Sequence, residues 1–215
     1  MARELTERGE DRKSQLLEHA ASLFESRGYA DTRITDIAAA AGVAKGLLYW
    51  YFPSKEALLA ELIDDVQNRL RHLQGDALEG IDNALERIYV GTFVTVRFVA
   101  DHFHLYGVLA AATAGQTDAP LARSMAMHAT DTTGVLADGQ RQGVVRNNEA
   151  AELLSYSISA IVNELVRFRE IGLLRQSVDE LAGLAARSAV HTVAADPAMV
   201  TAILRRHKTL TRNVA

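Results

Sequence analysis

The sequence contains no cysteine and only three prolines among its 215 residues. Without cysteine, disulfides, thiolate zinc sites and cysteine nucleophiles are excluded for this chain. Few prolines favour helix, because proline removes a backbone donor and interrupts helices, whereas the abundant Ala and Leu are among the best helix formers. We therefore expect a nearly all-α protein without cysteine-based chemistry.

Long apolar runs are also missing. The longest nearly uncharged apolar stretch, residues 105–114, is far shorter than the roughly 18 to 20 residues that a membrane-spanning helix needs. The first fifteen residues mix both charge signs and contain no apolar run, unlike a secretory signal. We expect a cytoplasmic protein that does not cross a membrane.

The chain also has no excess of positive charge. The chain has 23 Lys and Arg against 27 Asp and Glu, for a net charge of −4. Residues 1–60 carry eight Lys and Arg against nine Asp and Glu. Attraction for a polyanion would therefore have to come from locally clustered cations and from helix termini.

What the sequence does have is helical periodicity, without strand-like alternation. We expect Gly28 in the left-handed conformation to end the first helix, and Asp31 and Thr32 to cap the second, which runs through Ala41. The first helix is expected at residues 12–27. The helices after the second are expected at residues 43–51, 55–73, 80–100, 101–114, 120–142, 148–171 and 177–195, with a short one after Pro197.

The helix over residues 55–73 joins a small front domain, residues 1–60, to a helical body, residues 61–215. Because one helix runs across this boundary, we expect the two parts to be rigidly joined.

The stretch Thr32–Lys55 has the length and pattern of a helix-turn-helix, with two short helices that meet at Gly42. In that motif the second helix lies in the DNA major groove and presents its first turns to base edges. The same pair of helices also occurs as an ordinary corner in enzymes and scaffolds, which is the alternative interpretation.

The first turn of that second helix consists of Ala44, Lys45, Gly46 and Leu47. Lys45 can donate to guanine, the small Ala44 and Gly46 permit close approach, and Leu47 can contact a thymine methyl group. The side chains suited to donate to phosphate oxygens are Tyr49, Tyr51 and Lys55.

This segment resembles the TetR family of bacterial transcriptional regulators. The resemblance covers about Ser14 to Leu62, and the remaining two thirds of the chain match only in being helical. The matching positions are Gly28-Tyr29, Thr32, Ile34, Asp36-Ile37-Ala38, Ala41-Gly42-Val43, Lys45-Gly46, Leu48-Tyr49, Tyr51-Phe52 and Ser54-Lys55-Glu56-Ala57-Leu58-Leu59.

The resemblance implies a homodimeric, ligand-responsive repressor that binds a palindromic double-stranded DNA operator and releases it when a small molecule occupies the C-terminal domain. It implies that Leu48 and Phe52 are core residues. Base-facing positions would be Thr35 and the stretch Ala44–Leu47, and phosphate-facing positions would be Arg33, Tyr49, Tyr51 and Lys55.

The sequence departs from the family at three positions. Ala44 stands where many relatives carry serine, and Leu47 where many carry threonine or serine, so the operator sequence cannot be borrowed from relatives. Trp50 stands where histidine or another aromatic residue is common, and we assign it no phosphate contact.

The C-terminal two thirds should hold the effector pocket, because pockets in helical bundles are apolar with a few polar groups. Each candidate is more often a plain core or surface residue than a ligand contact, since aromatic and Met stripes chiefly fill cores. The candidate ligand-binding residues are Tyr89, Phe93, Phe98, Phe103, Tyr106, Met125, His128, Tyr156, Asn163 and Phe168.

Neither a metal site nor a catalytic constellation stands out. His102 and His104 lie near Asp101, but residues at i and i+2 on a helix point to different faces. No Ser–His–Asp set, glycine-rich phosphate loop or paired carboxylate motif is recognisable. We therefore expect no enzymatic activity, no metal and no cofactor.

The last two long helices suit dimerisation. Pairing the helix in residues 173–195 with its predecessor across a twofold axis gives a four-helix interface. The alternative is that both helices pack inside one chain. Apolar and small residues at helical spacing are Val178, Leu181, Ala182, Leu184, Ala185, Ala189 and Val193.

Two functions stay open on the sequence alone. One is the ligand-responsive dimeric repressor, or an activator with the same DNA geometry. The other is a helical small-molecule-binding protein or enzyme whose front domain has no DNA role, an alternative that the near-neutral charge of residues 1–60 favours.

Overall fold

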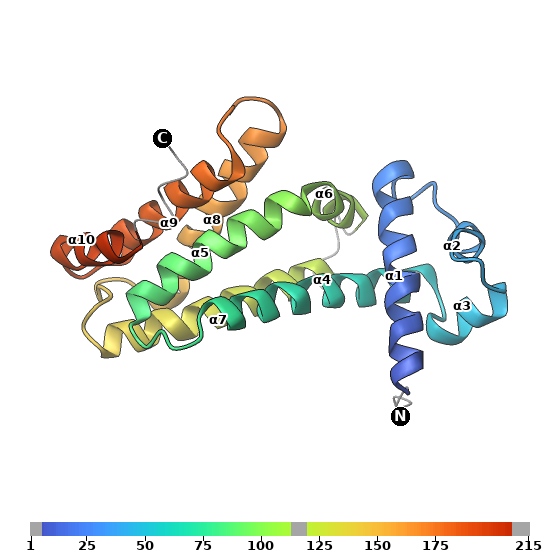
Figure 1. Ribbon diagram of the computed structural model, residues 1–215, viewed down its shortest axis with the longest axis horizontal. Coiled ribbons are helices and arrows are strands. Elements are labelled where there is room, and N and C mark those ends of the chain that lie inside the picture. Colours follow the sequence, from blue (N-terminus) through green and yellow to red (C-terminus); the bar gives the residue numbers. More distant parts are fainter. Residues whose placement is uncertain (1–5, 113–119, 208–215) are drawn as a thin grey trace. The chain divides into compact units, whose positions relative to one another are not determined.

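The structure is a computed structural model that describes residues 6–112 and 120–207 (Figure 1). Within these ranges every regular element is an α-helix, and one isolated antiparallel bridge joins Val145 and Ala194. This confirms the all-α prediction. The helices are α1 (Glu7–Arg27), α2 (Ile34–Ala40), α3 (Lys45–Tyr51), α4 (Lys55–Ala77), α5 (Ala84–Asp101), α6 (Phe103–Ala112), α7 (Pro120–Arg141), α8 (Ala151–Glu170), α9 (Val178–Val193) and α10 (Pro197–Arg206).

The junction between α1 and α2 differs from the expectation. Thr32 is fully buried and does not cap α2, because its hydroxyl donates to the carbonyls of Gly28, at 2.8 Å, and Leu23. At the start of α2 the Asp36 carboxylate instead accepts from the Arg33 N–H at 3.0 Å. Gly28 caps the end of α1, as predicted, and has a positive φ of 82° that favours glycine, although its ψ of 158° is extended rather than helical.

The chain divides into two compact units. The first consists of Met1–Gln67 and His104–Ser124, and the second of Asn68–Phe103 and Met125–Ala215. The first crossing between units falls inside α4. In the described residues, no helix is both long and apolar enough to span a membrane.

The first unit packs α1, α2, α3 and the first part of α4 around one apolar core. α2 contacts both α1 and α3 (Figure 1). Leu48 and Phe52 are fully buried, as the resemblance implies. The other fully buried side chains of this core include Leu16, Ala20, Phe24, Ile37 and Leu58.

The second unit is built around the contact between α5 and α9, with α8 packed against both. Small residues on α9 allow the two helices to approach closely, since an alanine side chain adds little thickness. The α9 residues that are fully buried in this way are Ala182, Ala185, Ala186 and Ala189.

The small-residue stripe predicted for dimerisation therefore lies mostly inside the chain. Leu181 and Val193 are buried with the alanines, whereas Leu184 is 42% exposed. The physical reason is that α9 is apolar around most of its circumference, so its periodicity alone does not reveal which neighbour covers each side.

The end of α10 is fastened to α5 through a buried carboxylate. Glu86 is only 6% exposed; it forms an ion pair with Arg206 and a hydrogen bond with His207, whose Nε2 lies 2.7 Å from Glu86 Oε1. The His207 ring also stacks on Tyr89, with 5.5 Å between ring centroids.

The second unit is tightly packed around Gly139 on α7. A Cβ built there would overlap Val145 Cγ2 and lie 3.0 Å from Ala84 Cβ. We expect Gly139→Ala to lower the free energy of unfolding by about 1–3 kcal/mol, measured by urea denaturation, although alanine is the better helix former.

Gly134 provides the matched control on the same helix, because a Cβ there meets nothing within 4 Å. Gly134→Ala should raise the free energy of unfolding by about 0.5–1 kcal/mol. Equal stabilisation by both substitutions would show that the contact at Gly139 is not as close as described.

Candidate nucleic-acid interface

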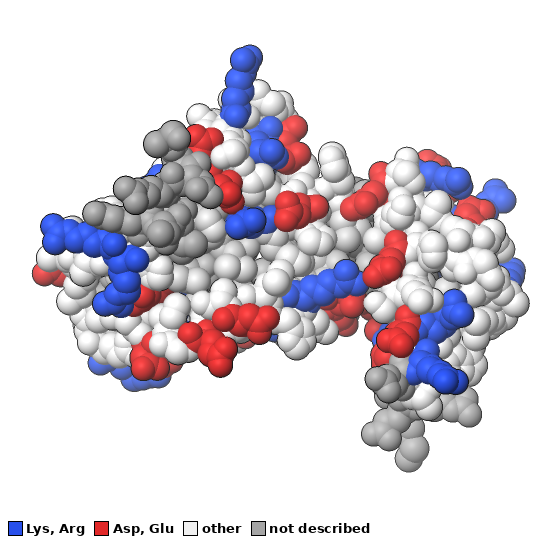
Figure 2. Space-filling model, in the orientation of Figure 1, with Lys and Arg blue, Asp and Glu red and all other residues white. Residues whose placement is uncertain are grey.

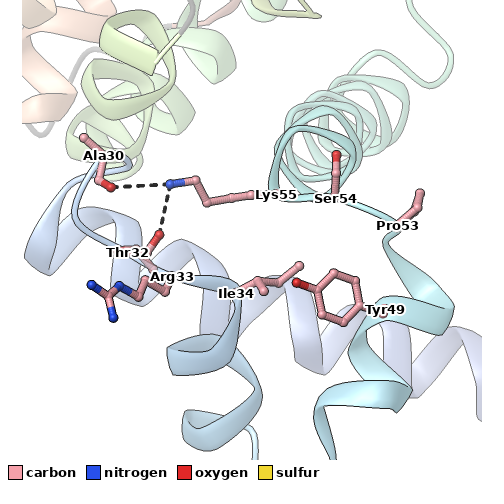
Figure 3. Close-up of a pocket in the computed structure, with 8 residues that line it drawn as sticks. All are labelled: Ala30, Thr32, Arg33, Ile34, Tyr49, Pro53, Ser54 and Lys55. Carbon is pink, nitrogen blue, oxygen red and sulfur yellow. Dashed lines mark hydrogen bonds between the residues drawn. The ribbon is translucent and has the colours of Figure 1, made fainter.

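A hollow of about 390 Å³ opens on the first unit between the α1–α2 loop, α3 and the start of α4 (Figure 3). It brings together three side chains that were predicted to face phosphates: Arg33, Tyr49 and Lys55. The Arg33 guanidinium extends away from the Lys55 ammonium. The full lining is Ala30, Thr32, Arg33, Ile34, Tyr49, Pro53, Ser54 and Lys55.

The Lys55 ammonium is held by the backbone of the α1–α2 loop. Its Nζ donates to the carbonyl of Tyr29 at 2.8 Å. It also donates to the carbonyls of Thr32 at 3.0 Å and Ala30 at 3.5 Å (Figure 3). It also lies 4.2 Å from the centroid of the Tyr29 ring. Lys55 therefore fastens this loop to α4, and its contact with phosphate stays a prediction.

The start of α4 is held by a second set of contacts around Glu56. The Ser54 hydroxyl accepts from the Ala57 N–H at 3.1 Å. The pKa of Glu56 is lowered, first by the hydrogen bond from its own backbone N–H and then by that with Ser54. Burial raises the pKa of Tyr29, and the charge of Glu56 and the hydrogen bond between the two side chains raise it further. These contacts fix the orientation of the helix that follows α3.

Most of α3 faces outward. Leu48 is its one buried residue, while Leu47 and Tyr49 are 40% exposed and Trp50 is 51% exposed. Each helical residue turns by about 100°, so Gly46 and Trp50 lie about 200° from Leu48, on the outermost face. In Figure 2 the surface over α2 and α3 is mostly uncharged. The outer face of α3 is thus small, apolar and aromatic.

Trp50 is the site residue that sequence reasoning passed over. Its ring packs edge-on against Tyr51, with 4.6 Å between centroids and an 88° interplanar angle. Its outward position follows from the sequence once Leu48 and Phe52 are taken as the buried side of the helix, so the signal was present in the helical phase.

The remaining residues predicted to face DNA are placed as follows. Thr35 on α2 is exposed, as are Ala44 and Lys45 at the start of α3. The Lys45 ammonium lies 5.4 Å from the centroid of the Tyr49 ring. Tyr51 is half-buried. The exposed residues are accessible to a ligand, and their contacts with bases and phosphates stay predictions.

The predicted effector-pocket residues are spread over several environments. Tyr156 and Asn163 were expected among apolar neighbours, but both are exposed, because they lie on the side of α8 opposite the buried Leu154, Ile158 and Val162. Met125 and His128 lie outside the residues whose side chains are described. The buried candidates are Tyr89, Phe93 and Phe98, and the half-buried ones are Phe103, Tyr106 and Phe168.

Two buried polar groups occur among these candidates. The Tyr106 phenol accepts from Gln67 Nε2 at 3.1 Å, and burial raises the pKa of Tyr106 to about 12 while the Gln67 bond lowers it. The Tyr89 hydroxyl oxygen is buried and has no hydrogen-bond partner in the described part of the chain. Burial raises the pKa of Tyr89, and the charge of Arg187 opposes this shift.

The histidines of α5 and α6 do not assemble a metal site in the described structure. His102 Nδ1 bonds the Phe98 carbonyl oxygen at 2.8 Å, and its ring stacks on Phe98. Across residues 6–112 and 120–207, excluding side chains that are not described, no three His, Asp or Glu side chains are grouped to hold an ion.

Because Lys55 connects the α1–α2 loop to α4, removal of its ammonium group should destabilise the protein. We expect Lys55→Met to lower the free energy of unfolding by about 1.5–3 kcal/mol, because the loop carbonyls lose a charged donor. Urea denaturation followed by circular dichroism measures this change.

The control is Lys45→Met, which removes an exposed ammonium from α3 and should change stability by less than about 0.5 kcal/mol. If the two substitutions have the same effect, Lys55 does not hold the loop.

Comparison with known proteins finds relatives of the segment that forms this interface. Residues 16–62, which run from α1 into α4, match the family described as bacterial regulatory proteins, tetR family. The HTH-type transcriptional repressor KstR2 of Mycobacterium tuberculosis is 36% identical over 98 residues, which are 46% of this chain and 48% of KstR2. The chain thus spans about half the length of this curated relative.

Two solved structures share the fold over a larger part of the chain. TylP, a TetR regulator from Streptomyces fradiae, has a TM-score of 0.76 at 20% identity and covers 96% of this chain and 99% of its own. A Saccharomonospora viridis protein has a TM-score of 0.72 at 22% identity and covers 86% and 98%. Residues 16–62 of the chain are thus similar to the TetR family of bacterial regulatory proteins.

Proposed function

We propose that the protein is a ligand-responsive transcriptional regulator, and more specifically a repressor, without enzymatic activity of its own. It binds a palindromic DNA operator as a homodimer and releases it when a small molecule occupies the second unit. The observation that carries the proposal is the outward face of α3, which lies inside the segment that matches the family. A protein that acts on chromosomal DNA in bacteria works in the cytoplasm.

In the DNA complex, α3 lies in the major groove and α2 crosses the backbone. Thr35 and the stretch Ala44–Leu47 then face bases. Because the first sixty residues carry no net positive charge, the phosphate contacts must be few and well placed. We assign these contacts to Arg33, Tyr49, Tyr51 and Lys55, with Lys55 also holding the loop from which Arg33 projects.

Exposed apolar side chains on α8 and α9 support dimerisation. Leu153 is 58% exposed and Tyr156 51% exposed, and their spacing of three places them on one face of α8. Asn163 lies further along the same helix and is also exposed, and Leu184 is the exposed apolar residue of α9. A twofold pairing through these surfaces would bury them and provide the second recognition helix that a palindrome requires.

The second unit offers a buried hydroxyl that a ligand can satisfy. The Tyr89 hydroxyl oxygen lacks a partner in the described residues, and a buried polar group without a hydrogen bond is unfavourable. Phe93, about one turn further along α5, provides an apolar side chain on the same face of the helix. The Saccharomonospora viridis protein was crystallised in complex with choline, which supports a small-molecule effector. The other candidates are those named from the sequence.

Release from DNA requires the effector to bind one conformation better than another, and the usual coupling is about 1–3 kcal/mol. Helix α4 begins at Lys55 in the first unit and continues to Ala77 in the second. It is the first covalent connection between the residues that face DNA and those of the effector domain, so we assign the transmission of the signal to it.

Selection of bound duplexes from a random library, with the purified full-length protein, tests the function. We expect a palindromic consensus whose half-sites are about 34–36 Å apart or a multiple of that, and an affinity that falls steeply with salt. Arg33→Gln should reduce the slope of log K against log salt by about 0.9, as expected for one lost phosphate contact.

Two further variants separate the assigned roles. Lys45→Ala should relax the preference at one position, whereas Tyr49→Phe should weaken binding similarly on all sequences. If a folded, dimeric and ligand-free protein enriches no sequence, the proposal is refuted, and the alternative of a helical small-molecule-binding protein or enzyme without a DNA role is favoured.

Gly46 separates stability from DNA binding. A Cβ at Gly46 meets nothing within 4 Å, so packing within the chain does not require glycine. We expect Gly46→Ala to raise the free energy of unfolding by about 0.5–1 kcal/mol and yet to weaken operator binding, because the methyl group occupies space that the DNA needs. Unfolding and fluorescence-anisotropy titrations measure the two effects.

Gly134→Ala is again the matched control, since it adds the same methyl group to an open helical position of the second unit. It should stabilise the protein without changing operator affinity. Unchanged operator affinity in Gly46→Ala would show that DNA does not approach α3 at this position.

A further inference from the structure

The exposed residues of α3 and its N-cap have a limited chemical repertoire. Residues 44–51 include one cation, Lys45, and no carboxylate or amide side chain. In the major groove, amides pair with adenine, carboxylates accept from cytosine, cations pair with guanine, and apolar groups contact the thymine methyl. The recognition helix therefore lacks the usual readers of adenine and cytosine.

The outer face of α3 instead presents two large apolar side chains. Leu47 is 40% exposed and Trp50 is 51% exposed, and they are three residues apart, on neighbouring turns. The contact with Tyr51 orients the Trp50 ring. Gly46 lies one turn before Trp50, and a Cβ built there would meet nothing within 4 Å. The result is an apolar surface that a groove lined with methyl groups would cover.

The side chains next to Leu47 and Trp50 add little preference for one base over another. The Thr35 hydroxyl on α2 can both donate and accept, so it fits more than one base. Tyr49 lies on the flank of α3 and lines the hollow shared with Arg33, where we assign it to phosphate. Specificity then depends on Leu47, Trp50 and Lys45.

We propose that Leu47 and Trp50 are specificity-determining residues that read thymine methyl groups, and that Lys45 reads a guanine in the same half-site. The inference rests on the proposed function and specifies which bases each half-site of the operator must contain. Each half-site is then defined by at least two thymines and one guanine, while adenine and cytosine matter only as their pairing partners.

Replacement of single thymines by deoxyuridine in the selected operator provides the test, because it removes one methyl group and leaves base pairing intact. We expect two positions per half-site at which deoxyuridine weakens binding of the full-length protein by about fourfold, the scale for one buried carbon group. Deoxyuridine in the flanking sequence is the DNA control and should have no effect.

Protein variants then assign each methyl group to a side chain. Leu47→Ala should bind the thymine and deoxyuridine operators equally well at one sensitive position, and Trp50→Ala at the other. Leu47→Met keeps an apolar side chain of similar volume and should retain the methyl dependence. A merely structural role for Leu47 would not predict that Leu47→Ala loses this dependence at one position alone. Met199→Ala, which trims an exposed apolar residue of α10, is the protein control. Circular dichroism verifies that every variant is folded.

The outcomes separate this inference from the proposed function. Methyl-sensitive positions that disappear in the matching variants support the inference. A specific palindromic operator in which no thymine methyl contributes overturns it and leaves the regulator function intact. The absence of any enriched operator overturns both.

Discussion

Helix α3 is too short to hold its own position, and this constraint governs the whole first unit. It has seven residues and one buried side chain, whereas isolated helices below about 12–15 residues are marginal in water. Its orientation must come from its neighbours. Leu48 and Phe52 insert into the core that α1 and α2 provide, and the Lys55 ammonium joins the loop before α2 to the helix after α3. The outer surface of α3, which we propose faces DNA, is thus set by residues that need not touch DNA.

The sequence predicts the elements well because helical periodicity is a local signal. The described helices lie within a few residues of the expected ranges, and the buried Leu48 and Phe52 follow from the resemblance. Local patterns do not record which distant neighbour covers a given face. The alanines of α9 were read as a dimer surface but pack inside the chain, and Tyr156 and Asn163 were read as pocket residues but are exposed.

The candidate site likewise contains features that local sequence patterns predict and long-range contacts that they do not. Lys55 was predicted to donate to phosphate, but its partners are carbonyls 23 to 26 residues earlier in the chain, which no spacing rule reveals. Trp50 could have been placed from helical phase alone. The proposed apolar reading face also agrees with the near-neutral charge of residues 1–60, because apolar contacts with bases would reduce the share of binding that phosphate charge must supply.

The hydrogen bonds of Glu86 with Arg206 and His207 link positions 120 and 121 residues apart. Loss of both partners would leave a buried carboxylate without compensation in the second unit, which is costly. These three positions are therefore expected to change together during evolution, with a neutral residue at position 86 in any relative whose chain ends before α10 is complete. The presence of a carboxylate on α5 and the length of α10 therefore evolve as a single linked trait.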